Sequence, residues 1–198
     1  MALAGLLLTI ALASCGGGPE LSPLGADARV LAFGDSLTFG SGAPTGRGYP
    51  EVLAELTGLE VINAGIPGET TTEGRQRLPG ILAEHGPALV VLVHGGNDIL
   101  RRQPAQTTRN NLIAMVEAIR HSGAQVVMLA LPGASLTLAP PKYYAEVANI
   151  ERVPIDDRIL QRLMRSPEYK SDQVHFNAAG YRHMAEAVRD LLLKTGAL

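Results

Sequence analysis

Residues 29–40 read RVLAFGDSLTFG, where an apolar run passes directly into the polar sequence Gly34-Asp35-Ser36. A short apolar run bounded by glycine predicts a buried strand over residues 29–33. Similar runs recur at residues 59–63 (LEVIN), 88–93 (ALVVLV) and 124–131 (AQVVMLAL). A weaker fifth run, residues 152–155 (RVPI), contains Pro154, which restricts it to an edge or a strand end. Strands that are apolar throughout are typical of a parallel sheet covered on both faces.

Helical patterns separate these strands. We expect helices over residues 50–56, from Thr70 with Glu73 completing a capping box, over 107–122, and over 177–194. The alternation predicts an α/β fold, a doubly wound three-layer α/β/α sandwich around a five-stranded parallel sheet. No internal repeat is present, so residues 27–198 are interpreted as a single domain.

Polar residues gather where the predicted strands end. Ser36 follows the first strand, Gly65 the second and Asn97 the third, while residues 172–177 (DQVHFN) precede the last helix. In an open parallel sheet, sites form outside the carboxyl ends of the strands. We therefore expect these four segments to meet at one edge.

Their residue types suit assisted nucleophilic attack. A serine hydroxyl needs a base within hydrogen-bond reach, and that base needs an orienting acceptor. Ser36, His175 and Asp172 supply these three roles. The Ser36 N–H, the Gly65 N–H and the Asn97 side-chain amide are candidate donors to the oxyanion of a tetrahedral intermediate.

Four local motifs carry a resemblance to a known family: VLAFGDSLTFG, VINAGIPGETT, LVHGGNDIL and DQVHFNAAGY. In this order they resemble the SGNH/GDSL hydrolases, notably the bacterial periplasmic arylesterase, acyl-CoA thioesterase I and lysophospholipase L1 subgroup. The family letters match Ser36, Gly65, Asn97 and His175. The resemblance implies a flavodoxin-like SGNH fold and a serine esterase. It departs from the family pattern at Phe176, where proline is common.

Each residue also has a simpler explanation. Ser36 could cap the helix after the first strand. Gly65 could serve a turn, and Asn97 with Asp98 could form an ordinary turn pair. Asp172 could be a surface carboxylate near Lys170.

Two apolar segments, residues 99–104 and 131–144, are expected to border the substrate site. The predicted rim comprises Asp35, Asp98, Leu100, Leu136, Tyr143 and Phe176. Short loops of this kind favour short to medium acyl esters or thioesters as substrates. Two alternatives stay open: an SGNH carbohydrate O-deacetylase acting on cell-wall glycan, and a lipid-anchored binding protein without turnover.

The N-terminus resembles a lipoprotein leader. Residues 1–15 are a predicted signal peptide. Its apolar run, residues 2–13, is broken only by Gly5 and Thr9, precedes Cys15 and is too short to span a membrane. Cys15 is the predicted lipidation site, and residues 16–26 are a predicted flexible tether. No basic residue precedes Cys15, which departs from the usual leader. The expected location is the bacterial periplasm or cell envelope, with membrane contact only through the anchor.

Composition argues against other classes of function. The net charge is −2, tryptophan is absent, and lysine and arginine are scattered, so a nucleic-acid partner is not expected. No HExxH or paired-cysteine spacing occurs, so neither a metal nor another cofactor is predicted. The sequence indicates no obligatory protein partner.

Overall fold

The computed structural model describes residues 18–198. The expected leader over residues 1–15, including Cys15, lies outside the described residues, as do the first two residues of the expected tether.

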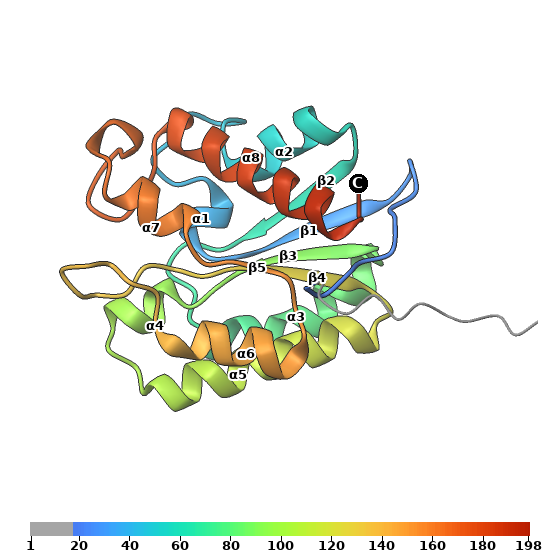
Figure 1. The fold of residues 1–198 in the computed structure, drawn as a ribbon, viewed down its shortest axis with the longest axis horizontal. Helices are drawn as coiled ribbons and strands as arrows, with labels where there is room; N and C mark the ends of the chain where they lie inside the picture. The colour runs from blue at the N-terminus through green and yellow to red at the C-terminus, as the bar shows by residue number, and fades with distance from the viewer. Residues whose placement is uncertain (1–17) are drawn as a thin grey trace, which may run out of the picture.

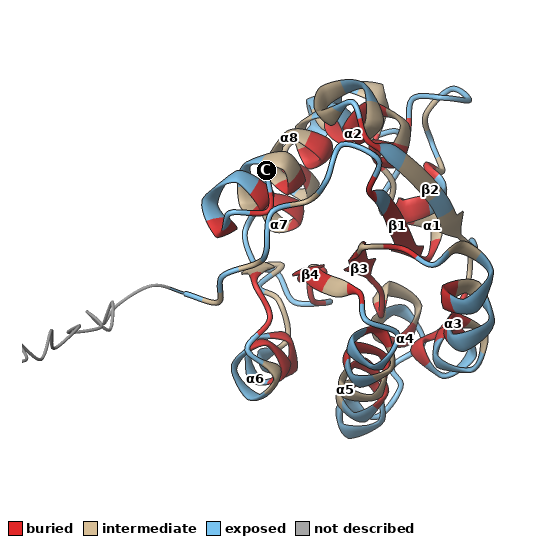
Figure 2. Cartoon of the chain, turned by 90° about the vertical axis from the view of Figure 1, so that its right-hand side faces the viewer, coloured by how far each residue is buried: buried red, intermediate tan, exposed pale blue. Residues whose placement is uncertain are grey.

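A parallel five-stranded sheet forms the centre of the domain (Figure 1). The strand order β2-β1-β3-β4-β5 confirms the doubly wound prediction. Both faces are covered, and the inner strands β1, β3 and β4 are almost wholly buried (Figure 2). The strands are β1 Arg29–Gly34, β2 Glu60–Gly65, β3 Leu89–Val93, β4 Gln125–Leu129 and β5 Ile155–Asp156.

Helices cover the two faces of the sheet (Figure 1). One face carries α2 (Tyr49–Thr57), α7 (Ile159–Met164) and α8 (Ala178–Thr195), and the other carries α3 (Thr71–His85), α5 (Ala105–His121) and α6 (Lys142–Glu151). Short helices follow strands at the carboxyl edge: α1 (Ser36–Phe39) after β1 and α4 (Gly96–Leu100) after β3. A 3-10 turn, Pro167–Tyr169, precedes the segment that leads into α8. The helix faces turned toward the sheet are buried (Figure 2).

The predicted helix starts and strands agree with the structure to within a few residues. The capping box at Thr70 is present, because Thr70 accepts from the Glu73 N–H and Glu73 accepts from the Thr70 N–H. The fifth strand, Ile155–Asp156, shares only Ile155 with the expected residues 152–155. It begins after Pro154 and lies at the sheet edge, which confirms the expected position. Helix α6 was not predicted: the segment expected as a loop through residue 144 becomes helical at Lys142, because Tyr143 and Tyr144 pack into the core.

The segment before β1 packs against the domain. The Leu21 N–H donates to the Thr195 carbonyl and the Leu24 N–H to the Ala197 carbonyl, both at 2.8 Å. Ser22 and the Gln125 side chain exchange two further hydrogen bonds. Over these residues the structure therefore differs from the expected flexible tether, because the segment pairs with the end of α8 and the start of β4.

Among residues 18–198, no helix has the length and apolar character needed to cross a membrane.

Candidate active site

Ser36 lies where β1 ends and α1 begins. Asp35 caps α1, and its side chain accepts the Leu37 N–H at 3.2 Å. Burial raises the pKa of Asp35, although the nearby His94 and the bonds from the Leu37 and Gly96 N–H groups oppose that rise. Asp35, which is only 2% exposed, thus holds the turn that presents Ser36.

Ser36, His175 and Asp172 form one hydrogen-bonded chain. The Ser36 Oγ lies 3.0 Å from His175 Nε2, and His175 Nδ1 lies 2.8 Å from Asp172 Oδ2. A carboxylate can only accept, so Nδ1 carries the ring proton and Nε2 is left free to accept from the serine hydroxyl. This tautomer is the one that can remove a proton from Ser36.

The Asp172 carboxylate is held at both oxygens. The main-chain N–H groups of Val174 and His175 donate to Oδ1 at 2.8 and 2.9 Å, while the His175 ring donates to Oδ2. These bonds, the one from Val174 first, lower the pKa of Asp172 to about 2. Asp172 is therefore ionised at neutral pH, and its side chain is 52% exposed.

Asn97 and Gly68 lie beside Ser36 on the wall of the cleft. The Asn97 Nδ2 donates to the Glu69 carbonyl at 3.0 Å and makes a longer contact of 3.4 Å to Asp35 Oδ2. Gly68 adopts a φ of 82°, a left-handed conformation that favours glycine. Within residues 18–198 its main-chain N–H has no hydrogen-bond acceptor. Gly68 is thus a glycine of the second motif with a free donor at the cleft.

Gly65, the expected glycine donor, is placed differently. It still belongs to β2, and its N–H donates to the Asn63 side chain at 3.0 Å. A Cβ at this position would overlap the Phe39 main chain. Gly65 therefore serves close packing of β2 against α1 and does not line the cleft, which corrects the assignment from sequence.

The cleft beside Ser36 has a volume of about 390 Å³. A space of this size suits a small molecule. Its apolar wall comes from the short helices α1 and α4, from the loop after β4, from α7 and from the segment before His175. The residues are Leu37, Ile99, Leu100, Leu131, Leu138, Met164 and Val174.

Comparison with known proteins identifies the family. The sequence pattern of the GDSL-like Lipase/Acylhydrolase family matches residues 32–183. This range contains all four segments of the site. The chain belongs to this family. It is a hydrolase of the SGNH/GDSL type that acts on ester bonds.

Named relatives and a solved structure agree with this membership. An arylesterase of Vibrio mimicus is 31% identical, over 85% of this chain and 90% of its own. The thioesterase 1/protease 1/lysophospholipase L1 of Escherichia coli (strain K12) is 28% identical, over 75% of each chain. The crystal structure of TesA superimposes with a TM-score of 0.76 at 30% identity, covering 83% of this chain and 97% of that one.

Some of the residues that were predicted to form the rim of the substrate site are instead buried in this GDSL hydrolase. Asp35 and Leu100 line the cleft, as expected. Asp98 is buried and accepts from the Thr71 N–H at 2.8 Å, so it joins α4 to α3. Tyr143 packs in the core of the domain, while Leu136 is fully exposed and stands outside the cleft wall.

Phe176, the departure from the family pattern, also lies beneath the site. Its ring is fully buried and meets the Tyr181 ring edge-on, with centroids 5.7 Å apart. Its main chain pairs with Lys170 across the loop that carries Asp172 and His175. Phe176 thus anchors this loop from below instead of forming the pocket wall.

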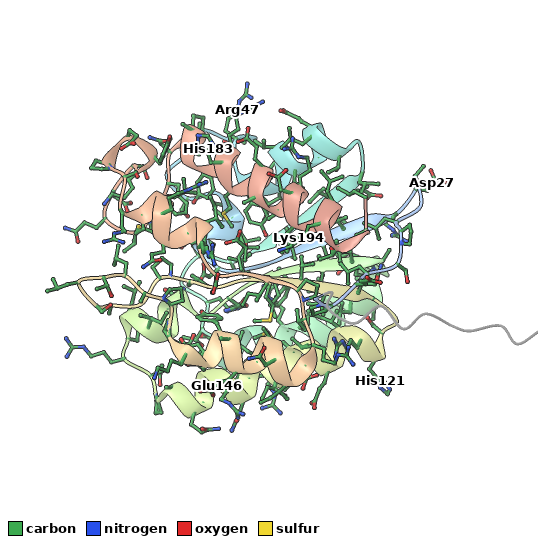
Figure 3. The ribbon with its side chains drawn as sticks, viewed as in Figure 1. Asp27, Arg47, His121, Glu146, His183 and Lys194 are labelled. Atoms are coloured by element: carbon green, nitrogen blue, oxygen red, sulfur yellow. The ribbon has the colours of Figure 1, made fainter. Side chains whose placement is uncertain are left out.

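The remaining histidines lie away from the cleft wall. His121 ends α5 on the side of the molecule opposite the site, and His183 lies on α8 (Figure 3). His94 is buried behind the cleft. In the described part of the chain, no group of three or more His, Cys, Asp or Glu residues is arranged to hold a metal ion.

Proposed function

We propose that this SGNH hydrolase cleaves short to medium acyl esters or thioesters through an acyl-enzyme formed on Ser36. The observation that carries the proposal is the hydrogen-bonded chain from Ser36 through His175 to Asp172 at an apolar cleft. A binding protein would not need an ionised carboxylate, a fixed imidazole tautomer and a hydroxyl in line.

The reaction follows from this geometry. His175 Nε2 takes the Ser36 proton as Oγ attacks the carbonyl carbon, and Asp172 stabilises the imidazolium that forms. The collapsing intermediate expels the alcohol or thiol, which takes the proton from His175. Water then attacks the acyl-serine ester by the same route, releasing the acid and restoring Ser36.

Three donors face the developing oxyanion in this proposal. They are the Ser36 main-chain N–H, the Gly68 main-chain N–H and the second N–H of the Asn97 amide. The first Asn97 N–H is held by the Glu69 carbonyl, and the second makes only the longer 3.4 Å contact to Asp35. Gly68 supplies the free donor that Gly65 lacks. Donors fixed in advance stabilise the transition state more than the ground state.

The cleft wall favours an acyl group over a sugar. Leu131, Leu138 and Met164 present aliphatic and thioether surfaces to the cleft. Relatives are named for arylesterase and thioesterase activities, which supports the same substrate class. The carbohydrate O-deacetylase is the alternative, because acetyl is the smallest acyl group this cleft would take.

We further propose that the protein acts in the bacterial periplasm or cell envelope, held by lipid at Cys15. This rests on the apolar run of residues 2–13, which is followed closely by Cys15. Mass spectrometry of the protein from its native host tests it, since lipidation adds acyl chains to a new N-terminal Cys15. An intact, unlipidated Met1 would refute it.

The activity is tested with p-nitrophenyl esters of increasing acyl length. Wild type should hydrolyse the shorter esters, and Ser36→Ala and His175→Ala should each lower kcat by about 10³-fold or more. A fluorophosphonate probe should label wild type but not Ser36→Ala.

Other outcomes separate the alternatives. A folded wild type that labels but cleaves no p-nitrophenyl ester would favour the carbohydrate O-deacetylase, which acetylated glycans would then test. A folded wild type that neither labels nor cleaves would contradict the proposed mechanism and favour a binding protein.

A further inference from the structure

A buried ionic cluster lies directly behind the proposed oxyanion donors. Glu69 is 6% exposed and receives two bonds from Arg77, Nε to Oε1 at 2.7 Å and Nη2 to Oε2 at 2.8 Å. His94, which is 1% exposed, brings Nε2 to 3.0 Å from Glu69 Oε2. None of these three side chains lines the cleft.

The directions of the hydrogen bonds within this cluster follow from the charge on Glu69. Burial alone would raise the pKa of Glu69, but the bonds from Arg77 and His94 outweigh it, so the pKa is lowered. The resulting carboxylate only accepts, so His94 Nε2 must carry a proton and donate. The other ring nitrogen of His94, Nδ1, is buried without a partner. Burying this nitrogen without a partner costs free energy, which the bond from His94 to Glu69 must offset.

The main chain of Glu69 connects this cluster to two of the three proposed oxyanion donors, Gly68 and Asn97. Its carbonyl accepts from Asn97 Nδ2 at 3.0 Å, which orients the side-chain amide. Its peptide neighbour is Gly68, whose free N–H is at the cleft. Arg77 also donates from Nη2 to the Ala64 carbonyl at 3.0 Å, so the same side chain ties the turn to the end of β2.

The surrounding packing leaves the cluster little freedom. The Arg77 guanidinium stacks over the Phe33 ring, 4.3 Å from its centroid. Gly74 faces His94 so closely that a Cβ there would overlap the imidazole. A shift of Glu69 would therefore have to displace groups that are held from several sides.

We propose that Glu69 is a positioning residue for the oxyanion donors, locked by Arg77 and His94 so that Gly68 and Asn97 present their N–H groups in fixed geometry. This inference rests on the proposed function, because it assigns no contact between Glu69 and the substrate. It makes the His94–Glu69 bond part of the catalytic apparatus although both residues are buried.

The kinetic test compares kcat and KM for Glu69→Ala, His94→Phe and His94→Gln on one p-nitrophenyl ester. We expect kcat to fall about tenfold or more in Glu69→Ala and His94→Phe, with KM within about twofold, because misplaced donors affect mainly the transition state. His94→Gln supplies an amide donor in place of the imidazole and should recover most of the loss. If Glu69→Ala does not fold, the two His94 variants decide the question.

Asn111→Ala is the matched control for lost stability. Asn111 is also buried, at 5% exposed, and donates to Thr71 and Thr72 at 3.1 and 3.0 Å without touching Glu69. It should lower the melting temperature but leave kcat within about twofold. A loss of kcat that simply follows the melting temperature through all four variants would overturn the proposal.

A double-mutant cycle with Asn97→Ala identifies the route of the effect. If Glu69 acts through the donors, Glu69→Ala should lower kcat by only about threefold or less once Asn97 is gone. An equal loss in both backgrounds would overturn the positioning role. Full activity of Asn97→Ala alone would instead refute the proposed oxyanion role of Asn97, and this inference with it.

Discussion

Two polar clusters occupy the same edge of the sheet at different depths. In the outer one, His175 and Asp172 have side chains that are 24% and 52% exposed. In the inner one, the side chains of Glu69 and His94 are 5% and 0% exposed. The groups proposed to change charge during reaction lie in contact with solvent, whereas Glu69 is a buried carboxylate paired with Arg77 and His94. A substitution in the outer cluster should therefore lower the rate with little change in stability, whereas a substitution among the buried groups should also lower stability.

Asp172→Asn should have the largest effect. An amide can still accept the Val174 and His175 N–H bonds, but its own N–H would face His175 Nδ1 and favour the wrong tautomer. We expect kcat/KM to fall about 10²–10³-fold, with the free energy of unfolding changed by less than about 0.5 kcal/mol. Steady-state kinetics and urea unfolding check this. A near-normal rate would show that Asp172 does not orient the base.

Asp98→Ala should reverse that pattern. The buried Asp98 accepts from the Thr71 N–H and from the Thr108 hydroxyl, so its removal leaves buried donors unpaired. We expect the free energy of unfolding to fall by about 3 kcal/mol. Urea unfolding measures the loss, and Asp98→Asn, which keeps an acceptor oxygen, is the control. A change below about 1 kcal/mol would show that the hydrogen bonds to Asp98 contribute little to stability.

Met164→Ala should change which acyl chain lengths the cleft prefers. Met164 lines the cleft from the end of α7, and truncation enlarges the cavity. We expect kcat/KM for the longest accepted ester to rise about three- to tenfold relative to the shortest. Leu136→Ala is the matched control, because Leu136 is fully exposed outside the cleft wall. An equal shift in both variants would contradict the assignment of the acyl pocket.

Acid should produce the smallest effect. The pKa of Asp172 is lowered to about 2, so its stabilising bonds are complete above its ordinary pKa of 3.8 and are lost as the pH falls through about 2. Wild type should be slightly more stable than Asp172→Asn down to about pH 4, and this difference should vanish towards pH 2. Thermal unfolding against pH checks it. Solvent exposure keeps the difference small, so a difference that grows on acidification would refute this account.

Local sequence predicts the sheet and the meeting of Ser36, Asn97, Asp172 and His175, because apolar runs and the residues that follow them fix which edge each group reaches. The choice between Gly65 and Gly68 could not be made this way. Both belong to one motif, and only the end of β2 decides which one faces the cleft. The positive φ of Gly68 has no sequence signal that separates it from other glycines.

The rim was harder to predict for a related reason. Tyr143 and Phe176 are apolar enough for either a pocket wall or the core, and tertiary packing placed both inside. Helices α1 and α4 span four and five residues, too few to show a helical period. Glu69 and His94 gave no signal of partnership, since 25 residues separate them in the chain.

The packing of Leu21 and Leu24 against the end of α8 has a practical consequence. The chain enters the domain beside the start of β4 (Figure 1). The residues that line the cleft lie instead at and beyond the carboxyl ends of the strands. A bead, a chip surface or a fusion partner joined before Leu21 would thus be attached on the side of the domain away from the cleft. Immobilised in this way, the hydrolase would present its cleft to the bulk solution.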